Sequence, residues 1–382
     1  MTLILFGVFF LLVFLNIPIA VSLGLTAMIG LYVGGFPFSM FPNVMYASIG
    51  KFALLAIPFF VLAGSIMEYA GISQRLVNFA RTCVGHRKSG MLAVTVIVCC
   101  FFAAISGSGP ATVAALGTIL IPAMVHQGYD RGTSTALLSA SGAIGIIIPP
   151  SIAFVVYASC TDTSVGALFS AGIIPGILVG ISYLVAAMIA TRKNEVIMLP
   201  KASAAERWAA FKEAFWALLM PVIILGGIYG GIFTPTEAGA VAVAYGLIVG
   251  WVIKPLVTKV RKKEIYRPEK KLIPLLSDGA VSSSTIAMLN VFATVSGTMI
   301  TYTRIPAMLT QAMLSITDSK IIFLLILNVL LIIVGMFMET NSSILLLGPI
   351  LIPVATSFGV DPIHFAGIML LNLEIGMITP PF

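Results

Sequence analysis

GIIIPP at residues 145–150 and GMITPP at residues 376–381 each place a glycine and a proline pair inside a long apolar stretch. Proline removes a backbone N–H and blocks the helical bond to the residue four positions back, and glycine lowers the cost of leaving helical geometry. Each stretch therefore predicts a helix that is broken along its length. The same pattern occurs twice, 231 residues apart (376 − 145).

The composition places the whole chain in a membrane. Of its 382 residues only 9% are charged, and the mean hydropathy is +1.10, so polar side chains cannot cover a water-facing surface. Most apolar runs approach the ~20 residues with which a helix crosses ~30 Å of hydrocarbon, and strand-like alternation is absent. We therefore predict an all-α polytopic membrane protein. The runs are 1–15, which lacks the basic start of a cleaved signal, 17–35, 52–70, 91–125, 132–159, 165–191, 214–233, 237–253, 279–300, 321–355 and 365–378.

The positive charges, which give a net charge of +7, are concentrated in short loops. Of the 21 basic residues, eight fall in 254–271, five in 192–212 and three in 81–88. An excess of Lys and Arg in short loops marks the cytoplasmic side of a membrane protein. The charge therefore indicates topology and contact with the lipid bilayer, and no nucleic-acid partner is expected.

The apolar run 91–125 is too long for one crossing, and SGSGP at 106–110 interrupts it. Two legs of about 15 residues remain, each only ~22 Å long at 1.5 Å per residue. Because the chain must cross an even number of times between two cytoplasmic loops, we predict that 91–125 is a re-entrant helical hairpin. A broken crossing over 132–159 and a return crossing over 165–191 then follow.

An ungapped comparison of 107–150 with 338–381 indicates that the chain contains two repeats. Thirteen of the 44 aligned positions are identical, and LGTILIP from Leu116 stands against LGPILIP from Leu347. Many identical residues are Gly, Pro or Asp at fixed spacing, so shared hydrophobicity is a poor explanation. The predicted repeats are residues 1–213 and 214–382.

The second repeat is predicted to be inverted with respect to the first. Counting crossings forward from the 192–212 loop brings its hairpin, 321–355, in from the opposite side of the membrane, and a broken helix over 363–382 follows. The loop region 71–90 carries four basic residues and its counterpart 304–320 carries two, which agrees with opposite sides. In inverted-repeat transporters such breaks line a polar cavity near the bilayer midplane.

The hairpin tips and helix breaks are therefore the candidate substrate and ion sites. Freed carbonyls and helix C-termini suit a small hard cation such as Na⁺, and helix N-termini suit a carboxylate. The candidates are Ser106, Gly107, Ser108, Gly109, Thr112, Gly142, Gly145, Pro149, Thr340, Asn341, Ser342, Ser343, Gly376, Thr379 and Pro380. Na⁺ is expected as the coupling ion, with no other cofactor, at Ser106, Ser108, Gly145, Thr340, Asn341 and Gly376.

A purely structural interpretation of these residues competes with a site, because Gly and Ser also allow close helix packing and Pro often only kinks a membrane helix. The recurrence of both breaks in each repeat favours a site. Glu339 and Glu374 fall within the breaks of the second repeat, where an acidic residue is expected to be functional. Their counterparts are Ser108 and Ala143, so a carboxylate role would be confined to one repeat.

The sequence shows no motif of an enzyme or of a metal centre. No His/Glu metal motif, GxSxG or Asp pair at membrane depth is present, so an enzyme is not expected. The cysteines have no CxxC spacing and the histidines are far apart. These residues are Cys83, Cys99, Cys100 and Cys160, and His86, His126 and His364.

Several segments resemble the large membrane subunit (M, or DctM-type) of tripartite ATP-independent periplasmic (TRAP) transporters, within the ion transporter superfamily. The resemblance spans the chain and is carried by SGSGPATVAALG from Ser106, GIIIPPSI from Gly145, FTPTEAGA from Phe233, GPILIPVA from Gly348 and the final GMITPP. It implies a permease of the bacterial cytoplasmic (inner) membrane that imports a small organic anion by Na⁺ symport. A C4-dicarboxylate or a sialic-acid-like sugar acid fits the resemblance, which also implies an elevator motion.

The resemblance further implies two protein partners, a small four-helix membrane subunit (Q-type) and a periplasmic substrate-binding protein (P-type). No four-helix extension precedes Met1, so the small subunit is expected to be a separate chain. The alternative is a stand-alone ion-coupled anion transporter or antiporter of the same superfamily, which would work without a binding protein. The sequence does not name the anion.

The second repeat is expected to be truncated. After its proline pair the first repeat continues over 151–193, whereas the second stops one residue after Pro381. A half-helix that ends there would leave unpaired backbone groups at membrane depth, so we expect the natural protein to extend by roughly 40 residues.

Overall fold

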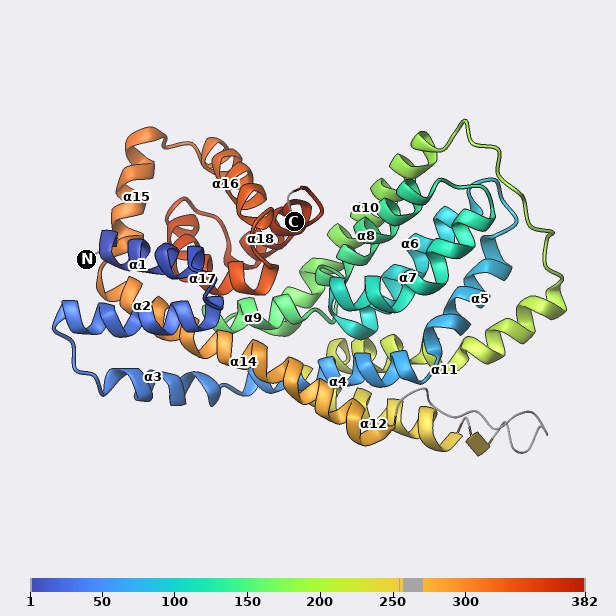
Figure 1. Cartoon of the computed structure of the whole chain (residues 1–382), viewed down its shortest axis with the longest axis horizontal. Coiled ribbons are helices and arrows are strands. Elements are labelled where there is room, and N and C mark those ends of the chain that lie inside the picture. The colour runs from blue at the N-terminus through green and yellow to red at the C-terminus, as the bar shows by residue number, and fades with distance from the viewer. Residues whose placement is uncertain (1, 254, 257–270, 381–382) are drawn as a thin grey trace. The chain divides into compact units, whose positions relative to one another are not determined.

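The computed structural model describes residues 2–253, 255–256 and 271–380, and over these ranges it contains helices and no strand, as predicted (Figure 1). Most of the basic segment 254–271 lies outside the described residues. The chain divides into two compact units. The first-hairpin unit comprises Ala56–Ile152 and Phe169–Ala280, and the second-hairpin unit comprises Met1–Leu55, Ala153–Leu168 and Val281–Phe382. Each unit draws on both halves of the sequence, so this division differs from that of the predicted repeats, which stay a prediction.

In the first-hairpin unit, α7 packs against α8, α6 contacts both, α4 packs on α12 and α5 on α11 (Figure 1). The helices are α4 (Ala56–Tyr69), α5 (Ile72–Val84), α6 (Gly90–Ser106), α7 (Gly109–His126), α8 (Arg131–Ala143), the 3₁₀ turn η2 (Ile144–Ile146), most of α10 (Val165–Ala190), α11 (Ala204–Tyr229), α12 (Pro235–Leu247), the π-helical η3 (Ile248–Ile253) and the start of α14 (Leu272–Tyr302).

In the second-hairpin unit, α16 packs against α18, α17 contacts α15 and α18, and α1 packs on α2. Its helices are α1 (Thr2–Phe14), α2 (Ile19–Gly34), α3 (Met40–Ile49), the 3₁₀ helix η1 (Phe52–Leu55), α9 (Ile152–Thr161), the rest of α14, α15 (Ile305–Ile316), α16 (Lys320–Gly335), α17 (Thr340–Ser357) and α18 (Pro362–Met377). The segments 71–90 and 304–320, expected as loops, thus contain α5 and α15.

The chain is a multi-pass membrane protein. Among the described residues, seven helical segments are long and apolar enough to cross a bilayer, and α15 with α16, bent by 118°, would make an eighth. The seven are Phe52–Tyr69, Gly109–His126, Val165–Ala190, Ala204–Tyr229, Pro235–Ile253, Leu272–Tyr302 and Thr340–Ser357. α11 starts ten residues before the apolar run because Ser203 and Glu206 form a capping box, in which each side chain accepts the backbone N–H of the other.

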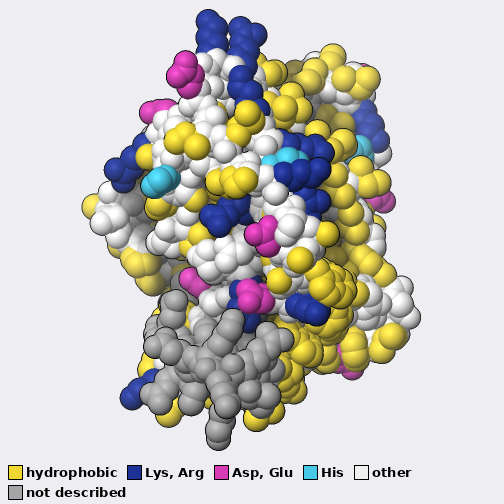
Figure 2. Space-filling view, turned by 90° about the vertical axis from the view of Figure 1, so that its right-hand side faces the viewer, with side chains coloured by type: hydrophobic (Ala, Val, Ile, Leu, Met, Phe, Trp, Pro, Cys, Tyr) yellow, Lys and Arg dark blue, Asp and Glu magenta, His cyan; other side chains and the backbone are white. Residues whose placement is uncertain are grey.

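The predicted first hairpin is present, since α6 and α7 are joined by a short turn and their outer ends meet. Tyr129, after α7, donates its hydroxyl hydrogen to Lys88 O (2.9 Å), just before α6. Lys88 Nζ also donates to Arg192 O (3.4 Å), so two of the basic segments expected in the cytoplasm lie together. Figure 2 shows Lys and Arg side chains on one face of the structure, interspersed with exposed hydrophobic side chains.

The second hairpin, α16 and α17, is closed at its outer end in a similar way. Lys320 Nζ, at the start of α16, donates to Gly359 O (2.6 Å), which follows α17. The rings of Phe323 and Phe358 stack beside this contact with centroids 4.2 Å apart. Both hairpins therefore have their two outer ends side by side.

The hairpin legs are longer than expected. α6 and α7 have 17 and 18 residues, in place of the 15 or so predicted for the first hairpin, and α16 and α17 have 16 and 18. The longest legs therefore extend about 27 Å at 1.5 Å per residue, nearly the hydrocarbon thickness. Leg length alone thus gives no argument for re-entrance, which stays a prediction.

The segments aligned in the sequence share their local structure. Gly128 and Gly359 both adopt positive φ (97° and 72°) just after α7 and α17. Asp130 and Asp361 both cap the next helix, accepting backbone N–H groups from Thr133 (3.0 Å) and from Ile363 (2.8 Å). The aligned segments therefore share these backbone features, while the duplication and the inverted placement of the repeats in a membrane stay predictions.

Candidate functional site

The tip of the first hairpin is a two-residue turn that requires glycine. α6 ends at Ser106, Gly107 adopts the left-handed conformation (φ 62°), and Ser108 is extended. An L side chain in the left-handed region costs about 1–2 kcal/mol. A Cβ at Gly107 would also lie 2.7 Å from Pro150 O, in the helix break. Both backbone conformation and close approach therefore favour glycine here.

Three neutral oxygens converge at this tip. The hydroxyls of Ser106 and Thr112 lie 3.0 Å apart, and both side chains are buried. Thr112 Oγ1 donates to Ser108 O (2.8 Å), and Ser106 Oγ lies 3.3 Å from the same carbonyl. The hydroxyls and the carbonyl thus form one cluster without a charged side chain.

The predicted break in 132–159 is present and packs against this tip. α8 ends at Ala143, and α9 begins at Ile152, directly after the Pro149–Pro150–Ser151 segment. A Cβ at Gly145 would lie 3.2 Å from Ser108 O and 3.3 Å from Thr112 Oγ1. Ile152 N donates to Gly107 O (3.3 Å). The tip therefore contacts the residues on both sides of the break.

The helix that follows the tip also approaches the end of α8. A Cβ at Gly109 would lie 3.3 Å from Ala143 Cα and 3.4 Å from Gly142 O. Pro149 is buried within the break. The structure thus brings together seven candidates of the first repeat, and the eighth, Pro149, lies in the adjoining break. The seven are Ser106, Gly107, Ser108, Gly109, Thr112, Gly142 and Gly145.

The tip of the second hairpin is built around a carboxylate. Glu339 is the N-cap of α17, and its Oε2 accepts Ser342 N (3.1 Å) while its Oε1 accepts Asn341 Nδ2 (2.8 Å). Ser343 Oγ donates to Glu339 O (3.1 Å). A negative charge is favoured at a helix N-terminus, so these contacts give Glu339 a structural role as a cap.

Other polar atoms of the second repeat have no such contacts. Thr340 Oγ1, Asn341 Oδ1 and both carboxylate oxygens of Glu374 are buried, and none has a hydrogen-bond partner in the described part of the chain. Glu374 is completely shielded from solvent (0% exposed). The second repeat therefore buries oxygens that the first repeat does not contain.

Gly376, expected in an unwound break, lies instead inside α18, whose last residue is Met377. Its position is set by close packing, since a Cβ there would lie 2.6 Å from Gly335 Cα in α16. The Gly376 carbonyl accepts Thr379 N (2.8 Å), and Pro380 is exposed. No hydrogen bond among the described residues joins these three to Thr340, Asn341, Ser342 or Ser343, and the proline pair's second member lies outside the described range.

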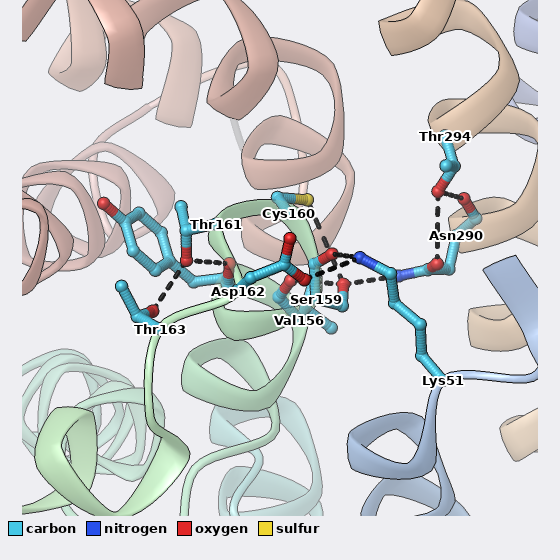
Figure 3. Close-up of polar contacts among 10 residues, drawn as sticks. Lys51, Val156, Ser159, Cys160, Thr161, Asp162, Thr163, Asn290 and Thr294 are labelled. Carbon is cyan, nitrogen blue, oxygen red and sulfur yellow. Dashed lines mark hydrogen bonds and ion pairs between the residues drawn. The ribbon is translucent and has the colours of Figure 1, made fainter.

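The sequence interpretation missed a polar network at the C-terminal end of α9 (Figure 3). Lys51 Nζ donates to Ser159 O (2.7 Å) and pairs with Asp162 Oδ1 (3.0 Å). Asn290 Nδ2 donates to Ser159 Oγ (2.9 Å). The lysine thus satisfies a carbonyl that has no partner within its helix. The only sequence signal was Lys51 itself, a single basic residue at the edge of the apolar run 52–70.

A second missed residue is Gly64 in α4. A Cβ at this position would lie 3.1 Å from Ser106 Cα, so the absence of a side chain lets α4 approach the first hairpin tip. Close approach of this kind is the usual role of small residues in membrane helices.

The donor set of the first tip is chemically limited. It offers hydroxyl and carbonyl oxygens, and over the described residues no group of three or more His, Cys, Asp or Glu side chains could hold a metal ion. Such a set fits a hard monovalent cation better than a transition metal.

Comparison with known proteins gives a consistent family. The isethionate TRAP transporter permease protein DctMQ of Oleidesulfovibrio alaskensis is 43% identical over 384 residues, which cover 99% of this chain and 58% of that protein. The C4-dicarboxylate TRAP transporter large permease protein DctM of Vibrio cholerae is 39% identical, over 96% of this chain and 83% of that protein. The sialic acid TRAP transporter large permease protein SiaM of Vibrio cholerae is 40% identical, over 88% of this chain and 77% of that protein.

Among solved structures, the Alcanivorax borkumensis YdaH transporter, described as having an unusual topology, resembles this fold with a TM-score of 0.60. The similarity covers 90% of this chain and 77% of that one at 14% sequence identity, so it concerns the fold alone. Residues 6–382 match the family described as "Tripartite ATP-independent periplasmic transporter, DctM component". The chain therefore belongs to the DctM family of tripartite ATP-independent periplasmic transporters.

Proposed function

We propose that this protein is the large permease subunit of a binding-protein-dependent secondary transporter in the bacterial inner membrane, and that it imports a small organic anion coupled to Na⁺. The observation that carries the proposal is the packing of the first hairpin tip, with its three converging oxygens, against the glycine-rich helix break. Family membership supports a transport role.

The substrate is a small organic anion, a carboxylate or a sulfonate. The relatives named for isethionate, C4-dicarboxylate and sialic acid transport all support this class. The N-terminus of α7 has no side-chain cap, whereas that of α17 already holds the Glu339 carboxylate. A helix N-terminus attracts an anion through its free N–H groups, so α7 is the more suitable helix to face the substrate.

Na⁺ is proposed to bind at the first tip, held by the hydroxyls of Ser106 and Thr112 and the carbonyl of Ser108. When bound, the ion supplies a positive charge that offsets the charge of the substrate. Gly145 lets the break approach these oxygens, because a side chain there would meet Ser108 O and Thr112 Oγ1.

The motion is proposed to be an elevator, in which the hairpins and broken helices move as a body against a scaffold. The partners are proposed to be a Q-type four-helix membrane subunit and a P-type binding protein. The joined name DctMQ of one relative, of whose length this chain spans 58%, supports the pairing with a small subunit.

The test is import into proteoliposomes that hold the permease with its small subunit, measured with and without the binding protein and across a range of Na⁺ concentrations. Leucine at Ser106, Ser108, Thr340 or Asn341 should raise the Na⁺ concentration for half-maximal import at least tenfold. Thr135→Val, on the exposed side of α8, is the control and should leave it unchanged.

An unchanged Na⁺ requirement in all four leucine variants would contradict the ion sites. Full import without the binding protein would favour the stand-alone anion transporter or antiporter.

A further inference from the structure

An open apolar groove lies between α5, α6 and α11 in the first-hairpin unit. It has about 400 Å³ of free space, within the ~300–1,000 Å³ typical of ligand sites, and its described lining residues include no charged side chain. Among these residues are Phe79 and Cys83 of α5, Ile97 and Phe101 of α6, and Leu218 of α11. Ile97 and Phe101 are exposed. The groove is therefore a surface that hydrocarbon covers more favourably than water.

The face of α11 that reaches the groove begins with an arginine. Arg207, Phe211 and Leu218 are spaced so that they share one side of the helix. The ring of Phe211 packs against Phe79 of α5, with the centroids 5.8 Å apart. Leu218 follows Arg207 by about 16 Å along the helix axis, close to the ~15 Å of hydrocarbon in one leaflet. The arginine and the groove are therefore spaced like the headgroup and an acyl chain of one phospholipid.

Arg207 has hydrogen-bonding capacity that its neighbours do not use. The side chain is partly buried, and its Nε has no hydrogen-bond partner among the described residues. The adjacent carboxylate, Glu206, accepts the backbone N–H of Ser203 as part of the helix cap. Lys212 Nζ lies 5.3 Å from the centroid of the exposed Trp208 ring. A guanidinium suits a phosphate, which can accept two of its N–H groups at once.

The surroundings of the groove also favour a negative charge. No acidic residue occurs between Glu68 and Asp130, a segment that includes α5 and α6, whereas four basic residues do. Lys88 Nζ donates to Arg192 O, so this segment lies beside the basic segment that leads to α11. Figure 2 shows Lys and Arg side chains next to exposed hydrophobic ones on the side of the structure at which α11 begins. Both basic segments are expected on the cytoplasmic side, where the leaflet carries anionic lipids.

We propose that this groove binds an acyl chain of an anionic phospholipid from the cytoplasmic leaflet, and that Arg207 binds the phosphate of the same lipid. The site shares no residue with the hairpin tips and does not depend on the proposed ion coupling. A zwitterionic phospholipid has the same chains and phosphate but adds a cation, so it binds more weakly beside these basic segments. The bound lipid contacts α5, α6 and α11 together and thereby stabilises their packing.

The experiment uses Cys83, which lines the groove, as the reporter. The permease and its small subunit are purified together in detergent and stripped of lipid, with alanine at Cys99, Cys100 and Cys160. The rate at which N-ethylmaleimide alkylates Cys83 is then measured as dioleoylphosphatidylglycerol is added. Lipid in the groove should slow this reaction, whereas glycerol 3-phosphate, which has no acyl chain, should not.

Dioleoylphosphatidylcholine should require at least about fivefold more lipid for half-protection, because one basic residue contributes ~1 kcal/mol near an anionic surface. Arg207→Gln should raise the half-protection concentration of phosphatidylglycerol by the same factor, and Arg207→Lys should keep most of the wild-type affinity. Lys201→Gln is the matched control, since it removes an exposed charge shortly before α11 and should change nothing.

Equal protection by the two phospholipids, or an unchanged half-protection concentration in Arg207→Gln, would overturn the proposal. Protection by glycerol 3-phosphate would overturn the lipid as the source of the phosphate. If Cys83 reacts in the isolated permease but not in the lipid-free complex, the small subunit covers the groove and the proposal is wrong. If the alanine replacements prevent folding, native mass spectrometry of the complex with its native cysteines must show less bound phosphatidylglycerol in Arg207→Gln than in Lys201→Gln, and equal amounts would overturn the site.

Discussion

The two hairpins share a frame, by which we mean the contacts at their outer ends and the glycine and aspartate that follow them, but their tips differ. Both are fastened at their outer ends, and both are followed by a left-handed glycine and an aspartate cap. At the first tip, Gly107 and the Ser106, Ser108 and Thr112 oxygens form a closed neutral cluster. The turn of the second tip, residues 336–339, has no glycine; Glu339 caps α17, and oxygens nearby are buried without partners among the described residues. The two hairpins thus share the parts that shape the helices and differ in the parts proposed to bind ions.

The largest effect is expected in the side of the membrane from which cysteines at the two aspartate caps can be labelled. Cysteine at Asp130 should react with a membrane-impermeant reagent only from the cytoplasm, and cysteine at Asp361 only from the periplasm, because the repeats are predicted to be inverted. Both residues are exposed, and the native cysteines would first be replaced. Labelling of both from one side would show that the shared frame is not inverted.

The next largest effect is expected for Gly107→Ala, which should destabilise the first tip more than the matching change destabilises the second. The methyl group would sit in the left-handed region and 2.7 Å from Pro150 O, so we expect a loss of at least about 2 kcal/mol and of most import. Gly35→Ala is the control, with a similar φ (68°) and no neighbour within 4 Å of its Cβ position. Met338→Ala, at the equivalent place in the second tip, should be mild. Equal unfolding temperatures for the Gly107 and Gly35 variants would contradict the close contact.

The shared frame predicts nearly equal effects for the two caps. Asp130→Ala and Asp361→Ala should each lower the free energy of unfolding by about 1 kcal/mol, and Asn at either position should restore most of it. Calorimetry of the purified variants would measure this. If the losses of unfolding free energy in Asp130→Ala and Asp361→Ala differed by more than about 1 kcal/mol, the two caps would not be equivalent.

The smallest effect is expected at the outer end of the first hairpin. Tyr129→Phe removes the hydrogen bond to Lys88 O and should cost about 1 kcal/mol. Burial raises the pKa of the Tyr129 hydroxyl above its usual value, so its contribution should be complete below pH about 10 and be lost as the pH rises through the raised pKa. Unfolding temperatures measured from pH 7 to 11 should converge for wild type and variant at the alkaline end. Lys320→Met tests the equivalent contact of the second hairpin.

Local chemistry explains what the sequence predicted well. Proline pairs and glycines act on their own backbone, so the break after Ala143 and the turn at Gly107 were predictable, as was the family. Side chains that act on distant segments were not predictable. Lys51 meets Ser159 across 108 residues, and no spacing in the sequence encodes that contact.

The second repeat shows the limit of reasoning by alignment. Gly376 aligns with Gly145, yet it packs in a helix against Gly335, because its neighbour in α16 is also a glycine and the backbones can touch. The expected position of Glu339 at membrane depth suggested a functional role, whereas in the structure its side chain caps α17. Continuous apolar runs do not reveal α5, which carries Gln74, Arg75 and Arg81, or α15, which is a short helix of 12 residues.

The network at the end of α9 has a consequence for biosynthesis. α9 has only ten residues, and its C-terminal contacts come from Lys51, made long before it, and from Asn290, made 131 residues after Ser159. Ribosomes add about 5–20 residues per second, so this helix waits roughly 7 to 26 seconds for its last partner. During that interval Lys51 is the part of the network already present in the chain. The first broken helix thus reaches its final contacts only when α14 has been synthesised.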